Sequence, residues 1–397
     1  MFVSHIDGFF PKKMNKLKKY LRRQLGFSYR FIRGIKTNNQ PKFSLSKDWL
    51  NLISLSNRDQ LVYPWISNNH QFFNMNKPKV EIDYFSWKIA FNALGALYSY
   101  ITTGNQADIR ALQTFFDNNI DPIGNWKTPI NRVDSGMKGY TLLYFRQLNT
   151  EKRYNIAADK LADEIINKHP RSKNNSFYYD FSSEAILVDT LGMICPFLAR
   201  YARIRKNQDA LDLSTVQILQ FIENNLDPET NLPYHGYYEN GPKRLGLHGW
   251  GRGTGWYMMG LIDTILELDD SQPDRNVFTI AYQETAKSLR KFQREDGHWN
   301  WAIPHRRDSF DSSTTSMIGY SLIRGYQQGL LDDSYRNPIK KAVNALLNTT
   351  RGNGLIDQSS GECRGLGKYP QVYGPTPWVQ GSATAFISIF FEIESKF

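Results

Sequence analysis

Cysteine is scarce in this 397-residue chain, which contains only Cys195 and Cys363. Two isolated cysteines exclude a disulfide framework, and neither a CxxC pair nor a zinc-ligand spacing is present. We therefore expect both cysteines to be small, buried, apolar side chains in a protein of a reducing compartment.

Long apolar runs are also missing. No stretch approaches the roughly 18 apolar residues that a membrane-spanning helix needs. The N-terminal region does not read as a secretory signal, because its basic residues alternate with apolar ones and no apolar core follows. Together with the cysteine usage, these absences predict a cytoplasmic protein.

Acidic residues are absent between Gly8 and Ser46, where eleven lysines and arginines occur. Residues 1–47 hold twelve of the 49 basic residues and one of the 38 acidic residues, so the rest of the chain carries 37 of each. The net charge of +11 therefore belongs to the N-terminal tail. A neutral body does not support nucleic acid as a partner.

The basic tail, residues 1–40, has some order of its own. Met14, Leu17, Leu21 and Leu25 recur at helical spacing, with lysines and arginines between them. The pattern predicts a basic amphipathic tail ahead of a single domain over residues 41–397. Such a helix could lie on an anionic membrane surface, which would make the protein membrane-peripheral. The alternative is a flexible basic arm, or a helix packed on the domain.

Several motifs of cofactor and metal sites are absent. The chain has no GxGxxG or GxxxxGK[ST] phosphate loop, no HExxH or two-His-plus-carboxylate spacing, and no Gly-x-Ser-x-Gly elbow. We therefore expect no cofactor, no metal ion and no covalent acyl chemistry.

What the chain does contain is a repeated pair of helices. In each unit an apolar helix with small residues precedes an amphipathic helix, and a turn rich in Asn, Gly and Asp closes the unit. The apolar helices are predicted at residues 84–103, 134–148, 185–205, 255–268, 313–329 and 382–394. The amphipathic helices are predicted at 107–119, 153–168, 209–225, 274–293 and 335–349, with 45–55 as the partner of the last apolar helix.

Six such hairpins, with apolar helices inside and amphipathic helices outside, predict an all-α fold, the (α/α)6 barrel or six-hairpin toroid. An open superhelical solenoid is the alternative, but the end units lack polar caps.

In the barrel, the loops that enter the inner helices line one funnel. Six of the nine tryptophans fall in or beside these loops: Trp126, Trp250, Trp256, Trp299, Trp301 and Trp378. Aromatic side chains around a concave mouth suit a carbohydrate.

Residues 249–256, Gly-Trp-Gly-Arg-Gly-Thr-Gly-Trp, are the centre of this pattern. Four alternate glycines are unfavourable in a helix, but they allow the backbone to approach a neighbour or a ligand closely. Arg252 offers a planar fork of donors that suits a carboxylate, and Trp250 and Trp256 offer flat apolar faces for sugar rings. The alternative is a tight helix entry with a salt-bridged arginine.

Two aspartates occupy similar positions in adjacent inner helices. Asp134 begins the second inner helix, and Asp189 lies in the apolar stretch 186–191. With Ser182 or Ser183 as the N-cap, Asp189 would fall near the second turn, where the effect of the helix dipole has faded. Burial there would favour the protonated carboxyl that a general acid needs. The alternative for each is a structural carboxylate bonded to an arginine or to the backbone.

His235 lies in the loop before the central stretch, among Tyr234, Tyr237 and Tyr238. A lone histidine in a loop is usually polar surface, but the surrounding tyrosines indicate a formed wall. We therefore expect His235 at the same mouth as the two aspartates.

Taken together, these segments resemble the glycoside hydrolase 88/105 group, the unsaturated glucuronyl and rhamnogalacturonyl hydrolases. The motifs that carry the resemblance are residues 133–136, 187–198, 234–236, 250–256, 294–299 and 312–317. The fold of this group is an (α/α)6 barrel, in agreement with the hairpin count. The resemblance implies that no metal is required.

The resemblance also implies a particular reaction. Enzymes of this group hydrate the C4=C5 double bond that polysaccharide lyases leave at a non-reducing end, and the resulting hemiketal opens and releases the unsaturated uronate. By motif, Asp189 would protonate C4 and then take a proton from the water that adds at C5. Asp134 would orient the sugar and act on the acidity of Asp189. The residues that would bind the oligosaccharide are His235, Arg252, Trp256, Trp250 and Trp299.

Two other functions stay open. An ordinary inverting glycosidase would use Asp134 and Asp189 as acid and base, with the carboxyl groups about 6.5–9.5 Å apart. A non-catalytic carbohydrate-binding scaffold would need neither carboxylate.

Overall fold

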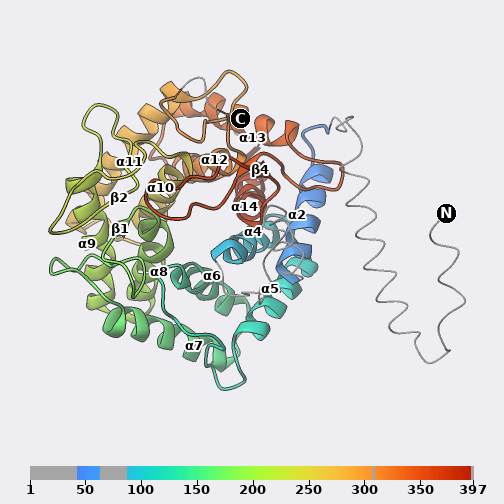
Figure 1. The fold of residues 1–397 in the computed structure, drawn as a ribbon. Helices are drawn as coiled ribbons and strands as arrows, with labels where there is room; N and C mark the ends of the chain where they lie inside the picture. The colour runs from blue at the N-terminus through green and yellow to red at the C-terminus, as the bar shows by residue number, and fades with distance from the viewer. Residues whose placement is uncertain (1–42, 63–86, 306–308, 395–397) are drawn as a thin grey trace, which may run out of the picture.

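The computed structural model describes residues 43–62, 87–305 and 309–394. The predicted tail over residues 1–40 lies outside these described residues, so its helix and its membrane contact stay predictions. The described helices form two concentric rings (Figure 1). The inner ring consists of α4 (Trp87–Thr103), α6 (Ser135–Leu148), α8 (Asp189–Arg205), α10 (Gly251–Ile265), α12 (Ser312–Gln327) and α14 (Pro377–Ile393). The outer ring consists of α2 (Lys47–Val62), α5 (Gln106–Asn119), α7 (Lys152–Asp163), α9 (Gln208–Asn225), α11 (Pro273–Phe292) and α13 (Arg336–Asn348).

The inner ring is closed. Each inner helix packs against the next one along the chain, and α14 packs against both α12 and α4. Helix α2 packs against α14, as predicted for the segment 45–55. The contact between α14 and α4 confirms the (α/α)6 barrel and rules out the open solenoid.

The inner helices are buried on almost all sides, because each one faces two inner neighbours and an outer helix. Every residue of α10 is buried, and in α14 only Glu392 is exposed. Glycines allow the closest approaches between neighbours. A Cβ on Gly381 of α14 would lie 2.2 Å from the backbone of Phe91 in α4, and one on Gly136 of α6 would lie 2.3 Å from Met193 O in α8.

The glycine-rich stretch is helical, which corrects the predicted start of α10. The helix begins at Gly251 rather than at Gly255. A Cβ on Gly251 would lie 2.3 Å from Thr314 Oγ1, and one on Gly255 would lie 2.7 Å from Met317 Cβ, both in α12. Close packing of α10 on α12 therefore offsets the poor helix propensity of these glycines.

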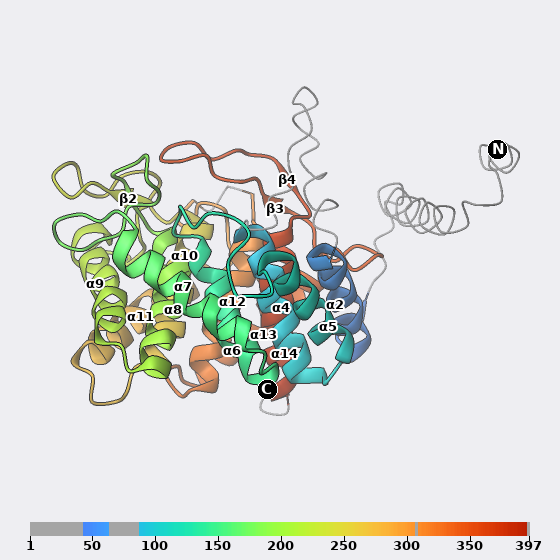
Figure 2. The same ribbon diagram turned by 90° about the horizontal axis from the view of Figure 1, so that it is seen from below.

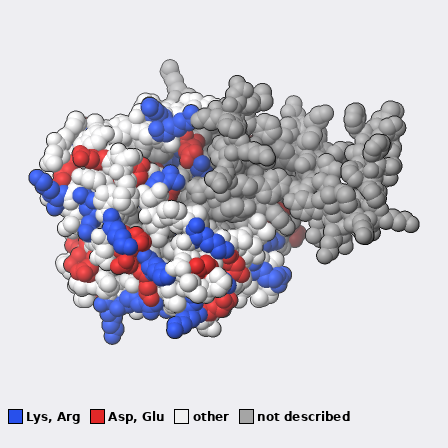
Figure 3. All heavy atoms as spheres, turned by 60° about the horizontal axis from the view of Figure 1, so that its bottom comes forward, with Lys and Arg blue, Asp and Glu red and all other residues white. Residues whose placement is uncertain are grey.

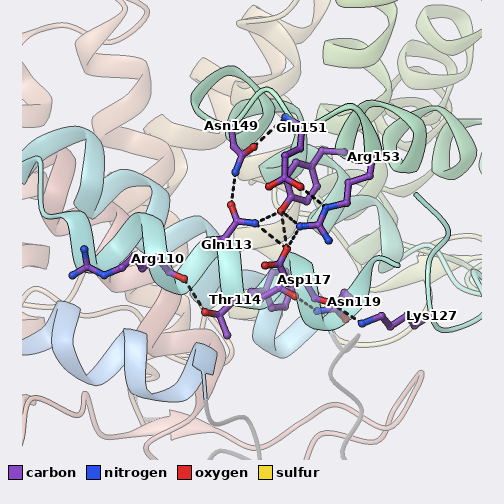
Figure 4. Close-up of polar contacts among 11 residues, drawn as sticks. Arg110, Gln113, Thr114, Asp117, Asn119, Lys127, Asn149, Glu151 and Arg153 are labelled. Carbon is purple, nitrogen blue, oxygen red and sulfur yellow. Dashed lines mark hydrogen bonds and ion pairs between the residues drawn. The ribbon is translucent and has the colours of Figure 1, made fainter. Parts of the chain in front are cut away.

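Polar contacts join neighbouring hairpins in the outer ring, as Figure 4 shows for α5 and the start of α7. Asp117 of α5 pairs with Arg153 Nη2 at 2.5 Å and accepts a hydrogen bond of 2.7 Å from the Tyr154 hydroxyl. Gln113 bonds both Tyr154 and Asn149. Polar side chains of α5 and α7 thus link the first hairpin to the second.

Short strands and loops gather at the end of the barrel where the inner helices begin (Figure 2). Strand β1 (Ile186–Leu187) pairs with β2 (Gly236–Tyr237), and β3 (Ser359–Ser360) pairs with β4 (Tyr373–Gly374), both antiparallel. A π-helix, η2 (Glu164–Lys168), continues α7, and a 3-10 turn, η3 (Asp333–Tyr335), precedes α13.

Charges of both signs alternate on the face drawn in Figure 3, in keeping with the neutral body. Of the helices that the structure describes, none is both long enough and apolar enough to cross a membrane.

Candidate active site

Asp134 and Asp189 both lie where an inner helix begins. Asp134 is the N-cap residue of α6, and Asp189 is the first residue of α8, which packs against α6. The loops that lead into the two helices are joined, because Val133 N–H donates to Tyr179 O and Tyr179 N–H donates to Ala185 O. The two aspartates therefore open onto the same end of the barrel.

The local position of Asp189 differs from the prediction. Neither Ser182 nor Ser183 caps α8; the pairing of β1 with β2 intervenes, and Val188 is the N-cap. Asp189 thus lies in the first turn rather than near the second, and the premise that the helix dipole has faded there is wrong. Its side chain is 13% exposed, and its Oδ2 is buried.

Tyr179 lies within electrostatic reach of both carboxylates. Burial, and then the negative charges of Asp134 and Asp189, hold the pKa of the Tyr179 hydroxyl well above its usual value, although Arg132 opposes them. Arg132 also pairs with Asp134, with Nη2 3.3 Å from Oδ2, and the Asp134 side chain is 5% exposed. The two carboxylates therefore share an environment in which Arg132 provides a positive charge.

His235 reaches Asp189 through the pairing of β1 with β2. Leu187 stands opposite Gly236, and Val188 N–H donates to His235 O at 2.9 Å. This pairing places His235 Nε2 3.5 Å from Asp189 Oδ2, with the histidine almost fully buried. The prediction that His235 and Asp189 share one mouth agrees with this geometry.

The segment between β3 and β4 forms another wall of the site. The Tyr369 hydroxyl lies 2.8 Å from His235 Nδ1. Burial, and then the negative charge of Asp189, raise the pKa of the Cys363 thiol to about 11, which places Cys363 near that carboxylate. The sequence interpretation passed over this segment. This segment leads into the inner helix α14. The expectation that loops entering inner helices line the funnel therefore applies to it as well.

Arg252 is buried and fixed to the β3 segment. Its Nη1 donates to the Ser360 hydroxyl at 2.8 Å and to Ser360 O at 3.2 Å, and its Nη2 donates to Gly361 O at 2.9 Å. The guanidinium carbon lies 5.1 Å from the ring centre of Trp250 and 5.5 Å from that of Trp378. No carboxylate pairs with Arg252 among the described residues, so the predicted salt bridge of the alternative reading is absent there.

The tryptophans predicted at the rim divide into two groups. The ring centre of Trp250 lies 4.5 Å from that of His235, so Trp250 belongs to the site. Trp256 is fully buried against Phe91, and its Nε1 has no hydrogen-bond partner among the described residues. Trp299 is also fully buried, and its Nε1 donates to Leu289 O of α11. The structure thus gives Trp299 a packing role, away from the mouth.

In the described part of the chain, no group of three or more His, Cys, Asp or Glu side chains is arranged to hold a metal ion. What gathers at the mouth is two carboxylates, a histidine, an arginine and aromatic rings. A carboxylate pair can transfer protons, and the rings can pack against a sugar. A closed (α/α)6 barrel with such a mouth fits the class of enzymes that act on carbohydrates.

The chain belongs to Glycosyl Hydrolase Family 88, whose sequence model matches residues 62–395. It is therefore a glycoside hydrolase with an oligosaccharide substrate, and the resemblance noted from the motifs is confirmed.

Individual relatives agree with this assignment. The unsaturated rhamnogalacturonyl hydrolase YesR of Bacillus subtilis (strain 168) is 24% identical over 307 residues, which cover 74% of this chain and 86% of YesR. A possible member of the GH105 family from Klebsiella pneumoniae has the same fold, with a TM-score of 0.79 at 18% identity over 90% of this chain and 96% of that one. The unsaturated glucuronyl hydrolase of Bacillus sp. GL1 gives a TM-score of 0.63 at 16% identity over 86% and 96% of the two chains.

Proposed function

We propose that this glycoside hydrolase removes an unsaturated uronic acid from the non-reducing end of an oligosaccharide by hydrating its C4=C5 vinyl ether. The observation that carries the proposal is the position of Asp189. It begins an inner helix 3.5 Å from His235, and its charge and that of Asp134 reach the same tyrosine. The names of the curated relatives, which act on unsaturated rhamnogalacturonyl and rhamnoglycuronyl substrates, support the substrate class.

Asp189 is the proton donor in this proposal. Its carboxyl protonates C4, the developing positive charge is carried by C5 and the ring oxygen, and a water molecule adds at C5. The carboxylate left on Asp189 takes the proton of that water, so the acid is restored at the end of the step. The hemiketal at C5 then opens, and the bond to the next sugar is lost.

The other residues of the mouth hold the sugar. Asp134 begins the inner helix next to that of Asp189 and orients the ring, while Trp250 offers an apolar face next to His235. Arg252 provides a positive charge for the carboxylate of the uronic acid, and its bonds to Ser360 and Gly361 fix that charge in advance of binding.

The test uses a panel of lyase-generated unsaturated disaccharides, both glucuronyl and rhamnogalacturonyl, and follows the ultraviolet absorbance of the double bond. Loss of absorbance is expected with at least one member. Asp189→Asn, which cannot deliver the proton, should lower kcat by about 1000-fold or more. Asp212→Asn, which changes an exposed carboxylate on the outer helix α9, should retain full activity.

The same assay separates the competing functions. An ordinary inverting glycosidase would release sugars while the absorbance of the double bond persists. A binding scaffold would neither release sugars nor change that absorbance. Either result, obtained with the folded wild-type protein, would refute hydration of the double bond.

A further inference from the structure

Tyr369 is the polar neighbour of His235 on the side away from Asp189. It lies in the segment between β3 and β4, and its ring centre is 5.4 Å from that of Trp250. The hydroxyl lies 2.8 Å from His235 Nδ1 and accepts a hydrogen bond of 2.9 Å from Leu247 N–H. A second backbone N–H, that of Gly367, also interacts favourably with the phenol oxygen.

The hydrogens at this oxygen can be assigned from the chemistry of its neighbours. A backbone N–H only donates, so Leu247 uses the phenol oxygen as an acceptor, and the nearby Gly367 N–H can act on that oxygen only as a donor. The phenol has one hydrogen of its own, and His235 Nδ1 is the one acceptor among these three neighbours. The Tyr369 hydroxyl therefore donates to Nδ1. A neutral imidazole that accepts at Nδ1 carries its hydrogen on Nε2.

We infer that Tyr369 is a positioning residue that fixes neutral His235 as the Nε2–H tautomer and so directs which oxygen of Asp189 carries the transferable proton; this inference rests on the proposed role of Asp189 as the acid. His235 Nε2 lies 3.5 Å from Asp189 Oδ2, so in this tautomer the nitrogen nearest that oxygen carries a hydrogen. The distance exceeds that of a hydrogen bond, and such contacts often tighten when a substrate binds.

The two oxygens of Asp189 are not equivalent in this arrangement. Oδ2 is buried, and no described residue forms a hydrogen bond with it, whereas the side chain as a whole is 13% exposed. With an N–H donor facing Oδ2, the proton of the acid resides on Oδ1, the oxygen that a sugar can reach. The opposite tautomer would place the bare lone pair of Nε2 against Oδ2 and would draw the proton away from the mouth.

The tautomer can be measured without substrate. In the full-length protein with 15N-labelled histidine, long-range 1H–15N correlation spectra distinguish protonated from unprotonated ring nitrogens, and His235→Gln identifies the His235 signals by their loss. In spectra of the neutral imidazole we expect Nδ1 of His235 at the shift of an unprotonated nitrogen and Nε2 at that of a protonated nitrogen. A protonated Nδ1 in neutral wild-type His235 would overturn the inference.

Tyr369→Phe then tests the role of the phenol. Without the hydroxyl, the His235 signals should move toward a mixture of the two tautomers. On an unsaturated disaccharide that the wild type accepts, kcat should fall by about 10- to 100-fold while KM changes by less than about threefold. Tyr373→Phe, at the start of β4, removes a hydroxyl that bonds Gln371 and should change neither the tautomer of His235 nor kcat.

Two results would count against Tyr369. If Tyr369→Phe folds, as judged by its circular dichroism and melting temperature, and its His235 tautomer is unchanged, the phenol does not set the tautomer. If the tautomer changes but kcat does not, the tautomer has no part in proton delivery. Absence of activity toward the whole panel would instead refute the proposed function, and the tautomer measured in the free protein would still decide the assignment.

Discussion

Asp134 and Asp311 are two aspartates at the starts of inner helices, and their surroundings predict opposite effects of substitution. As the N-cap of α6, Asp134 forms no capping hydrogen bond through its side chain. Asp311, the N-cap of α12, is fully buried and accepts from Ser313 N–H and Ser360 N–H. The Asp311 carboxylate therefore joins α12 to the β3 segment, whereas the Asp134 carboxylate pairs with Arg132 and does not cap its own helix.

Asp134→Asn should consequently separate activity from stability. We expect kcat for the unsaturated disaccharide to fall by about 100-fold or more, because the charge beside Asp189 is lost. The free energy of unfolding should change by less than about 1 kcal/mol, since Asp134 makes no capping hydrogen bond that could be lost and its ion pair with half-exposed Arg132 is weak. Urea denaturation and initial rates provide the two measurements.

Asp311→Asn is the matched contrast and should destabilise the fold, because an amide cannot accept from all the donors around this carboxylate. Full activity in Asp134→Asn would show that the second carboxylate is dispensable.

The candidate site residues stood out in the sequence through their motifs, and their roles in catalysis and binding stay predictions. Asp134, Asp189, His235 and Arg252 stood out because their local sequences are distinctive. Tyr369 did not stand out, because it lies in a loop that has no periodic pattern. Only the course of that loop in the fold brings it to His235. Trp299 lies in a loop and looks the same in sequence whether its indole faces a funnel or bonds a carbonyl of α11.

At the level of helices, the glycines at inner contacts are the sensitive positions. Gly381→Ala should lower the free energy of unfolding by about 1–3 kcal/mol, because the new Cβ would lie 2.2 Å from the backbone of α4 and the two helices would have to move apart. Gly374→Ala, seven residues earlier, meets no atom within 4 Å and is the control. Equal melting temperatures for the two variants would show that α14 and α4 can separate without cost.

The existence and type of the helices were predictable from periodicity, whereas their first residues were not. The glycines of α10 argued against a helix at Gly251, and contact with α12 overrides that preference. For α8, Ser182 and Ser183 were predicted as N-caps. The chain instead forms the pairing of β1 with β2 after these serines, and the helix begins only at Asp189. Both errors arise from tertiary contacts that local sequence does not encode.

At the level of the whole barrel, a second group of charges lies on the later turns of the inner helices, away from the mouth. Asp263 of α10 is buried, pairs with Arg324 at 3.2 Å and accepts from the Tyr320 hydroxyl. Glu267, just after α10, pairs with Arg200 at 2.9 Å. These side chains link α8, α10 and α12 across the interior.

This buried group predicts a pH dependence of stability. Burial raises the pKa of Asp263 to about 6 from 3.8, although Arg324 and Tyr320 oppose the shift. The folded protein then binds a proton more readily than the unfolded chain between about pH 4 and pH 6, so this contribution to the free energy of unfolding falls as pH rises through that window. Asp263→Asn should flatten the curve there, as measured by urea denaturation at each pH.

Asp332 is the control, because its contribution to stability changes with pH in the opposite direction. Hydrogen bonds from Ser334 lower the pKa of Asp332, so its contribution to the free energy of unfolding is lost as pH falls. Asp332→Asn should therefore remove this part of the loss of stability in acid. An unchanged slope between about pH 4 and pH 6 in Asp263→Asn would mean that this carboxyl keeps its ordinary acidity when folded.

Six hairpins and their closure into a barrel were predictable, because the alternation of apolar and amphipathic helices runs through the chain. The interior charges were not, since Asp263 and Arg324 read locally as single polar residues on apolar helices. The packing of α10 against α12 brings the two side chains within 3.2 Å of each other.

Closure of the ring by α14 also bears on how the protein is made. This helix follows all other described helices along the chain and fills the space between α12 and α4. Until residues 377–393 leave the ribosome, a nascent chain keeps the apolar sides of α4 and α12 uncovered. Chaperones would have to shield that seam during translation, and polypeptides released early would be prone to aggregate through it.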